Sequence, residues 1–267
     1  EKLQNALMAE GKTEAEAKLK GLEEFAVECA ILKVFGSEVM ALVADEGVQI
    51  YGGMGYSADA PMEAAYRDAR ISRIYEGTNE INRMLIVDMM LRKALKGHVD
   101  LLGPARRVAG ELMEIPDFGA DEPTEYLAPE AKVLRQLKKA GLLVAGAAVQ
   151  HYGTALAEEQ EALMRMADMA MEVYVLESAL LKTLKLEANF DPKEREIRSA
   201  LIKLQAYHAA EQCMRSGKEV ILALPENDEQ RMMLMGLRRF TKTVAYDIKS
   251  LRRLVASHVL EKNAYPF

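Results

Sequence analysis

The densest group of residues that could do chemistry lies between Gln49 and Arg83. It combines a glycine loop at 52–55, the turn Tyr75-Glu76-Gly77-Thr78 and a basic cluster. The basic cluster consists of Arg67, Arg70 and Arg73. Glycines let a ligand approach the backbone closely, and a helix N-terminus presents free N–H groups to an anion. Each signal is weak alone, because a glycine after a helix is more often a plain cap and such a glutamate is usually solvated.

Helices must position this cluster, because no segment shows the period-two alternation that is typical of a β-strand. Gly11 is expected to end a first helix, and Thr13 with Glu16 forms a capping box that starts the next. We expect that second helix to continue to about Ile50, where the glycine loop ends it. The sequence therefore predicts an all-α protein.

The turn itself is expected to join a loop to a helix. A polar, arginine-rich loop is predicted from Ser57 to Tyr75. Thr78 can then cap a helix whose first turn contains Glu80, where a negative charge complements the helix dipole.

The second half of the chain is predicted to be a bundle of four or five helices behind a boundary at 97–103. We expect one helix, then a loop from Ile115 to Pro129, then a long helical stretch from Glu130 to about Leu186. Asp191 and Asn227 each start a further helix as N-cap residues.

The stretch from Ala140 to Ala157 carries no charge. It contains His151 and three glycines and is too polar for a membrane-spanning helix. Buried packing of small residues between helices is the favoured interpretation.

Composition excludes several classes of protein. The 267 residues carry a net charge of −6, which argues against a general nucleic-acid binder. Two cysteines cannot build a disulfide framework or a zinc site. Cys29 and Cys213 are expected to be small buried hydrophobic residues, while His151 and His208 are expected to be structural, with no metal bound.

Charge is distributed unevenly, because the segment from Arg231 to Arg253 holds seven basic residues and one acid, Asp247. On a single helix the basic side chains would share a ~140° sector opposite an apolar face. A solvated face of the bundle is the favoured interpretation. The alternative is a surface for anionic lipid head groups or for an acidic partner.

Three segments in the first part of the chain, in this order and spacing, resemble the acyl-CoA dehydrogenase family. They are the stretch from Asp45 to Tyr56, then Arg67-Asp68-Ala69-Arg70-Ile71, then Tyr75-Glu76-Gly77-Thr78-Asn79-Glu80-Ile81-Asn82-Arg83. The region after Gly97 is similar to the additional helical domain of very-long-chain members. We expect residues 1–97 to belong to the helical domain with the catalytic base and FAD contacts, and 98–267 to form the second helical domain. The first residues have the pattern of the end of a helix, which predicts that this chain is the C-terminal part of a longer protein.

The resemblance implies an FAD enzyme that converts a fatty acyl-CoA thioester to the trans-2-enoyl-CoA in fatty acid β-oxidation. Glu76 would abstract the α-proton, which is weakly acidic, so this base needs a dry site. The β-hydride would pass to the flavin, whose electron chemistry belongs to the cofactor. The Glu76 N–H would help to hold the thioester carbonyl, and Tyr75 and Gly77 would contact the substrate.

The same resemblance implies two sets of FAD contacts. Thr78 and Glu80 would touch the flavin. A second set would contact the adenosine-diphosphate portion of an FAD bound mainly to a neighbouring subunit, which implies a homodimer or homotetramer. That set consists of Gln49, Ile50, Tyr51, Gly52 and Gly53. Ala64, where many members carry arginine, leaves the surrounding ion-pair network undefined.

Electron-transferring flavoprotein is the acceptor that the resemblance implies. A bacterial cytoplasmic location is expected, with the mitochondrial matrix as the alternative. A peripheral position at the inner membrane would follow only from the second interpretation of the basic segment. An acyl-CoA oxidase would share the architecture, but the continuation from Thr78 to Arg83 resembles a dehydrogenase. A third reading is a non-catalytic assembly or membrane-docking module.

Overall fold

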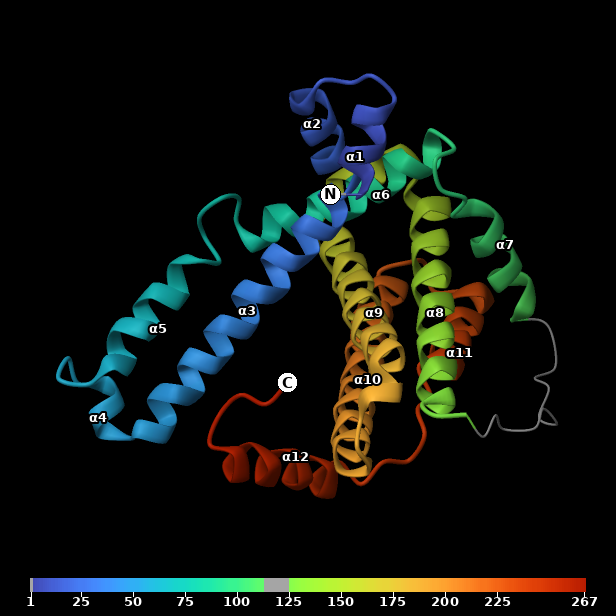
Figure 1. Ribbon diagram of the computed structural model, residues 1–267. Coiled ribbons are helices and arrows are strands. Elements are labelled where there is room, and N and C mark those ends of the chain that lie inside the picture. The colour runs from blue at the N-terminus through green and yellow to red at the C-terminus, as the bar shows by residue number, and fades with distance from the viewer. Residues whose placement is uncertain (1, 113–124) are drawn as a thin grey trace. The chain divides into compact units, whose positions relative to one another are not determined.

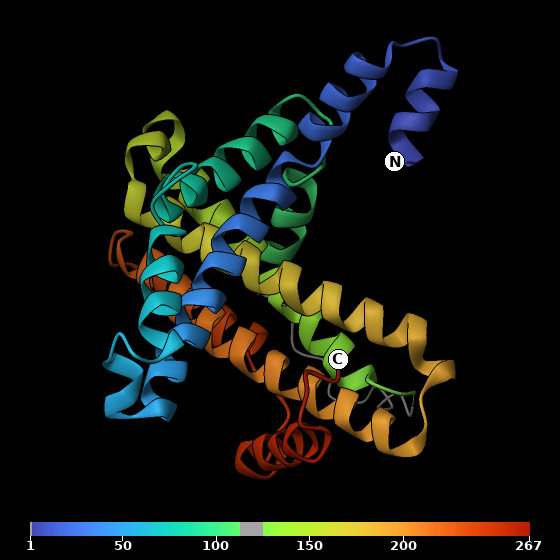
Figure 2. The same ribbon diagram turned by 60° about the vertical axis from the view of Figure 1, so that its left-hand side comes forward.

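The computed structural model describes residues 2–112 and 125–267, and these residues contain helices and no strand. The prediction of an all-α protein is thus confirmed for the part of the chain described. The chain divides into two compact units, Glu1–Lys96 and Gly97–Phe267. Each unit is helical and is described by itself below (Figures 1 and 2).

Unit 1 is organised around α3 (Ala26–Tyr51), the longest helix of that unit. The preceding helices are α1 (Lys2–Ala9) and α2 (Glu14–Glu24). The following ones are α4 (Gly53–Tyr56), α5 (Pro61–Ile71) and α6 (Asn79–Leu95). Both α5 and α6 pack against α3, so the turn that joins them lies beside that helix (Figure 1).

The predicted start signals of unit 1 are confirmed. Gly11 adopts φ +90° after α1, and Thr13 forms the complete capping box with Glu16 at the start of α2. The Thr78 hydroxyl accepts a hydrogen bond from Ile81 N at 3.3 Å and caps α6.

Two boundaries in unit 1 differ from the prediction. The helix expected to run unbroken to Ile50 is interrupted at Phe25, although neither glycine nor proline marks that break. The loop expected from Ser57 to Tyr75 contains α5, which begins with Pro61 at its first position after an extended Ala60. Proline suits a helix start because it lacks only an N–H that would have no intrahelical partner there.

Unit 2 is a bundle built on three long helices that lie side by side in both views (Figures 1 and 2). They are α8 (Ala128–Tyr152), α9 (Gln160–Leu186) and α10 (Pro192–Leu222). The shorter elements are α7 (Leu102–Glu111), η1 (Gly153–Glu158), η2 (Glu187–Asn189), α11 (Asp228–Phe240) and α12 (Ile248–Lys262). Fully buried Leu137, Met169, Leu176, Ile197 and Phe240 form the middle of its core.

The long helical stretch predicted from Glu130 to Leu186 is wrong as one element. Gly153, at φ +53°, ends α8, and a 3-10 turn separates it from α9. The N-caps Asp191 and Asn227 are confirmed, since their side chains accept from Glu194 N and Gln230 N, both at 2.8 Å. Most of the loop predicted from Ile115 to Pro129 lies outside the described residues, and Pro129 already belongs to α8.

The predicted burial of the uncharged stretch is confirmed for residues 140–149, which pack inside the bundle, and is wrong for residues 150–157, most of which are exposed. Ala140, Val144 and Ala148 of α8 are fully buried. None of the helices in the described ranges combines the length and apolarity needed to cross a membrane.

The basic segment is not one helix, so its predicted single 140° sector is wrong. Helix α11 ends at Phe240 and α12 begins after Asp247, whose carboxylate accepts from Ser250 N at 3.1 Å as the new N-cap. Between them the Tyr246 hydroxyl donates to Glu130 Oε1 at 2.9 Å. Because Glu130 is only 1% exposed, this contact fixes the connection to the body of the bundle. Arg238, Lys242, Lys249, Arg252 and Arg253 are exposed on two separate elements and the link between them.

Candidate functional site

The candidate site centres on the turn between α5 and α6, where two consecutive residues adopt left-handed backbone conformations. Glu76 has φ +55° and Gly77 has φ +81°. Glycine adopts this region freely, whereas a residue with a Cβ does so at a cost and needs support from its surroundings. The Glu76 side chain is exposed in the described part of the chain, and so is that of Tyr75, at 52%.

Support for the turn comes from the carbonyl of Gly77. Lys33 Nζ of α3 donates to this oxygen at 2.6 Å, and Asn82 Nδ2 of α6 donates to it at 2.8 Å. The same Asn82 nitrogen also donates to the Thr78 carbonyl at 3.1 Å. Across the turn, Asn79 N donates to the Arg73 carbonyl at 3.1 Å. The turn that contains the strained Glu76 is therefore held from two helices.

Buried polar contacts extend this support into α3. The Asn79 side chain, 2% exposed, accepts from Lys33 Nζ at 2.8 Å and exchanges hydrogen bonds with the Ser37 hydroxyl. Arg83 donates to both oxygens of Glu38, at 2.7 and 2.9 Å. Such a two-pronged pair fixes orientation as well as distance, so α6 is locked in register on α3.

Thr78 and Glu80, predicted to contact a flavin, lie together at the N-terminus of α6. Hydrogen bonds from its own backbone N–H and from the Thr78 hydroxyl lower the pKa of Glu80. Glu80 is consequently a stable carboxylate in the first turn, where the helix dipole favours negative charge.

The second predicted set, residues 49–53, is not brought to the turn. It lies at the end of α3, 16 residues beyond Lys33, which corresponds to about 24 Å along a helix. Ile50 is 81% exposed, and Gly52 adopts φ +60°. Nothing lies within 4 Å of a Cβ built on Gly52 or Gly53, so the backbone there is open to close approach.

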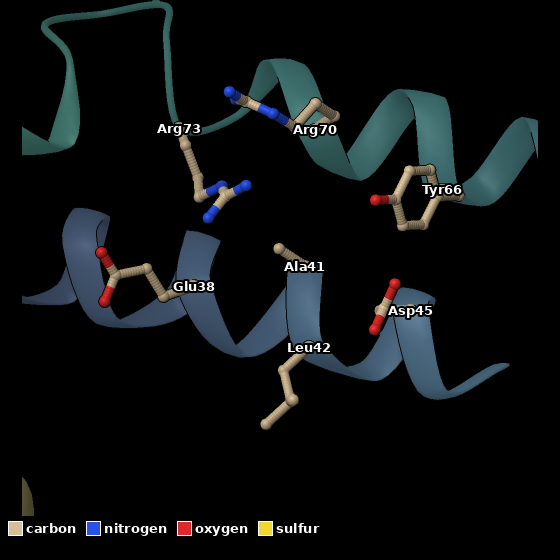
Figure 3. A pocket seen from close by; sticks show the side chains of 7 residues that line it. All are labelled: Glu38, Ala41, Leu42, Asp45, Tyr66, Arg70 and Arg73. Atoms are coloured by element: carbon tan, nitrogen blue, oxygen red, sulfur yellow. The ribbon is translucent and has the colours of Figure 1, made fainter. Parts of the chain in front are cut away.

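The basic cluster divides between two surroundings. Arg70 and Arg73 line a cavity of about 270 Å³ with Glu38, Asp45, Tyr66 and two apolar residues of α3. In this cavity Arg73 points toward α3, where Glu38 lies, and Tyr66 lies opposite Asp45 (Figure 3). Arg67 instead faces Glu63, at 3.6 Å. No residue that was predicted to contact the substrate or FAD lines the cavity.

Sequence reasoning missed Lys33 and Asn82. A lysine inside the apolar run from Ala30 to Phe35 is a signal in hindsight, because a charge on a packed face requires a partner. Asn82 carries no such signal, since a polar residue one turn into a helix is ordinary.

The cysteine and histidine predictions have mixed outcomes. Cys213 is fully buried, and that burial raises the pKa of its thiol, but Cys29 is exposed within unit 1, so its predicted burial is wrong. His208 lies 3.4 Å from Glu172, whose hydrogen bond raises its pKa against the opposing effects of burial and Arg252. No group of three potential metal ligands occurs in the ranges described.

Two family models match the chain, both described as the acyl-CoA dehydrogenase C-terminal domain, over residues 5–91 and 136–239. A protein of Bacillus subtilis (strain 168) named "Probable acyl-CoA dehydrogenase" is 38% identical over 250 residues, covering 92% of this chain and 41% of that protein. The human mitochondrial very long-chain specific acyl-CoA dehydrogenase is 32% identical over 207 residues, covering 66% of this chain and 30% of its own length.

Among solved structures, the acyl-CoA dehydrogenase of Bacillus anthracis complexed with FAD matches with a TM-score of 0.91 and 37% identity, covering 99% of this chain and 46% of that one. The chain thus spans less than half the length of these relatives. Both matched models describe the same family, and the relatives agree with the chain in sequence and in fold. The chain therefore belongs to the acyl-CoA dehydrogenase family.

Proposed function

We propose that this chain forms the helical part of an FAD-dependent enzyme that dehydrogenates fatty acyl-CoA thioesters to trans-2-enoyl-CoA in fatty acid β-oxidation. The observation that carries the proposal is the turn itself. An exposed glutamate in a strained backbone conformation is held from two helices at the N-terminus of α6. Strain that the surroundings maintain is characteristic of sites where the position of one side chain matters.

Glu76 is the proposed base for the substrate α-proton. A thioester α-proton is weakly acidic, so the carboxylate must be shielded from water to act on it. Described residues leave Glu76 exposed, and the walls that shield it are proposed to come from other parts of a longer protein. The backbone N–H of Glu76 would donate to the thioester carbonyl as enolate character develops, and Tyr75 and Gly77 would border the acyl chain.

The residues of this chain fit FAD at two separate places, each of which would supply part of a binding site. The open backbone at Gly52 and Gly53 accepts the close approach of a nucleotide, and the exposed Ile50 and Tyr51 flank it. Thr78 and Glu80 supply polar groups beside the proposed base. When bound, FAD supplies the acceptor for the β-hydride.

An oligomer, either a homodimer or a homotetramer, is part of the proposal. Thr78 and Glu80 lie at the start of α6, beside the turn that Lys33 of α3 contacts, whereas residues 49–53 lie about 24 Å further along α3 by helical rise; this separation favours their serving different FAD molecules. Exposed apolar side chains along α3 are suited to a subunit contact; they include Leu32, Val39, Leu42, Val43 and Ile50.

Electron-transferring flavoprotein is the proposed electron acceptor, and the bacterial cytoplasm is the proposed location. Contact with the inner membrane would use the exposed basic residues of α11 and α12. A solvated bundle face remains the favoured interpretation of those residues. Flotation with anionic vesicles tests it: equal association of wild type and the charge-reversed triple variant Arg238→Glu, Arg239→Glu, Lys242→Glu removes the membrane contact.

The decisive experiment is Glu76→Gln in the full-length, FAD-loaded protein. We expect loss of dehydrogenation and of α-proton exchange from acyl-CoA in heavy water, with FAD content unchanged. Glu23→Gln, which removes an exposed glutamate of α2, is the control and should retain both activities. Near-normal turnover in Glu76→Gln would refute the assignment. Oxygen uptake compared with reduction of an artificial acceptor separates an oxidase from a dehydrogenase.

A further inference from the structure

We propose that Lys33 is a positioning residue that sets the orientation of the Glu76 carboxylate by holding the Gly77 carbonyl. This inference rests on the proposed function of Glu76 as the base. It concerns a residue of α3 that lies 44 positions from the turn in the sequence and makes no direct hydrogen bond to Glu76.

The first step of the argument is the geometry of the ammonium group. Lys33 Nζ donates to Gly77 O at 2.6 Å and to Asn79 Oδ1 at 2.8 Å, so two of its three protons have acceptors on the turn and on α6. The Lys33 side chain is half-buried, which makes a charged hydrogen bond stronger than at the open surface.

The second step is what the carbonyl controls. Gly77 follows Glu76 directly, and both have positive φ. A hydrogen bond that holds the Gly77 carbonyl therefore restrains the backbone of both residues, including the angles that aim the Glu76 side chain. A Cβ-bearing residue leaves the left-handed region when it is not held there. Releasing Gly77 O would therefore let Glu76 relax and move its carboxylate.

The third step is that Lys33 and Asn82 hold the same carbonyl from different helices. Asn82 Nδ2 reaches the same carbonyl at 2.8 Å, but it belongs to α6 and moves with the turn. Lys33 belongs to α3 and ties the turn to a different element. The Arg83–Glu38 ion pair separately joins α3 to α6, so loss of the Lys33 contact should loosen the turn without separating the helices.

Lys33→Met in the full-length, FAD-loaded enzyme is the test. Because a shift of about 1 Å can lower a rate by roughly 10²-fold, we expect kcat to fall by at least about tenfold. KM for acyl-CoA and FAD content should change less than about threefold, since the variant removes no proposed binding contact. Exchange of the Asn79 amide proton, which reports closure of the turn onto Arg73 O, should accelerate.

Lys93→Met is the matched control. Lys93 is also a half-buried lysine of unit 1 that donates to a backbone carbonyl, Glu24 O at 2.8 Å, but at a place away from the turn. It should leave kcat and Asn79 exchange unchanged. Methylammonium added to Lys33→Ala should restore part of kcat, which a purely structural role does not predict.

The outcomes separate the two proposals. If wild type is active, Glu76→Gln is inactive, and folded Lys33→Met keeps wild-type kcat and amide exchange, the positioning role is overturned and the function stands. If Glu76→Gln remains active, the proposed function fails whatever Lys33 does. Should Lys33→Met not fold, Lys33→Arg replaces it, and failure of both to fold would assign Lys33 to stability and overturn the inference.

Discussion

Gly77→Ala offers a quantitative test of how the turn is held. The substitution places a Cβ on a residue at φ +81°, and the left-handed region costs an L-residue about 1–2 kcal/mol. The same Cβ would lie 3.0 Å from Asn82 Nδ2, so that side chain must shift. Asn82 donates to Gly77 O and Thr78 O, and each of these hydrogen bonds contributes about 0.5–1.5 kcal/mol.

Adding these effects, Gly77→Ala should reduce the stability of unit 1 by about 2–5 kcal/mol, and nearer the lower value where Asn82 keeps part of its bonding. Gly11→Ala is the control for backbone strain alone. Gly11 has φ +90°, but nothing lies within 4 Å of its Cβ, so the expected cost is about 1–2 kcal/mol.

Urea unfolding, read by hydrogen exchange on peptides from α3 and α6, measures unit 1 separately from unit 2. This separation matters because a chain with two compact units need not unfold in one step. A loss for Gly77→Ala no larger than that for Gly11→Ala would refute the role given to Asn82.

Three further predictions concern single residues. In the native protein, Cys29 should react with a thiol reagent while Cys213 does so only after unfolding, because burial raises the pKa of the Cys213 thiol and excludes the reagent. The hydrogen bond with Glu172 raises the pKa of His208 above its ordinary 6.5. Its contribution, below about 1 kcal/mol because the side chain is half exposed, is therefore full below that pH and lost as the pH rises through the higher folded value. Gly217→Ala should destabilise unit 2 by about 1–3 kcal/mol in urea, because the new Cβ would overpack the core.

Each has a control. Two native-state thiols that react equally fast would contradict the burial of Cys213. His208→Gln should flatten the stability difference between pH 6 and pH 8, and an unchanged slope would exclude this pair as its source. Gly141→Ala, another helical glycine with nothing within 4 Å of its Cβ, should instead stabilise the bundle by about 0.5–1 kcal/mol. Equal effects at the two glycines would contradict the packing argument.

Local rules explain which helix boundaries could be predicted from the sequence. Thr13, Thr78, Asp191 and Asn227 cap their helices through hydrogen bonds that reach only three residues along the chain. Pro61 carries a local helix-start signal of the same kind, but the arginine-rich composition around it is typical of a loop, and α5 begins there nevertheless.

Breaks without a local signal required the tertiary structure. The interruption at Phe25 has no glycine or proline, and the basic segment after Arg231 keeps a helical pattern of residue types across a non-helical link. Tyr246 explains the second break, because its hydroxyl reaches Glu130, 116 positions away.

The sequence by itself determined the all-α fold, the family and the residue proposed as the base, since these depend on periodicity and on residue types in order along the chain. Only the tertiary structure decided how Glu76 is held. Lys33 and Gly77 are 44 residues apart, and they meet because α6 and the turn before it pack on α3. A contact of that kind depends on which faces of two helices are buried together, and residue order does not specify that pairing.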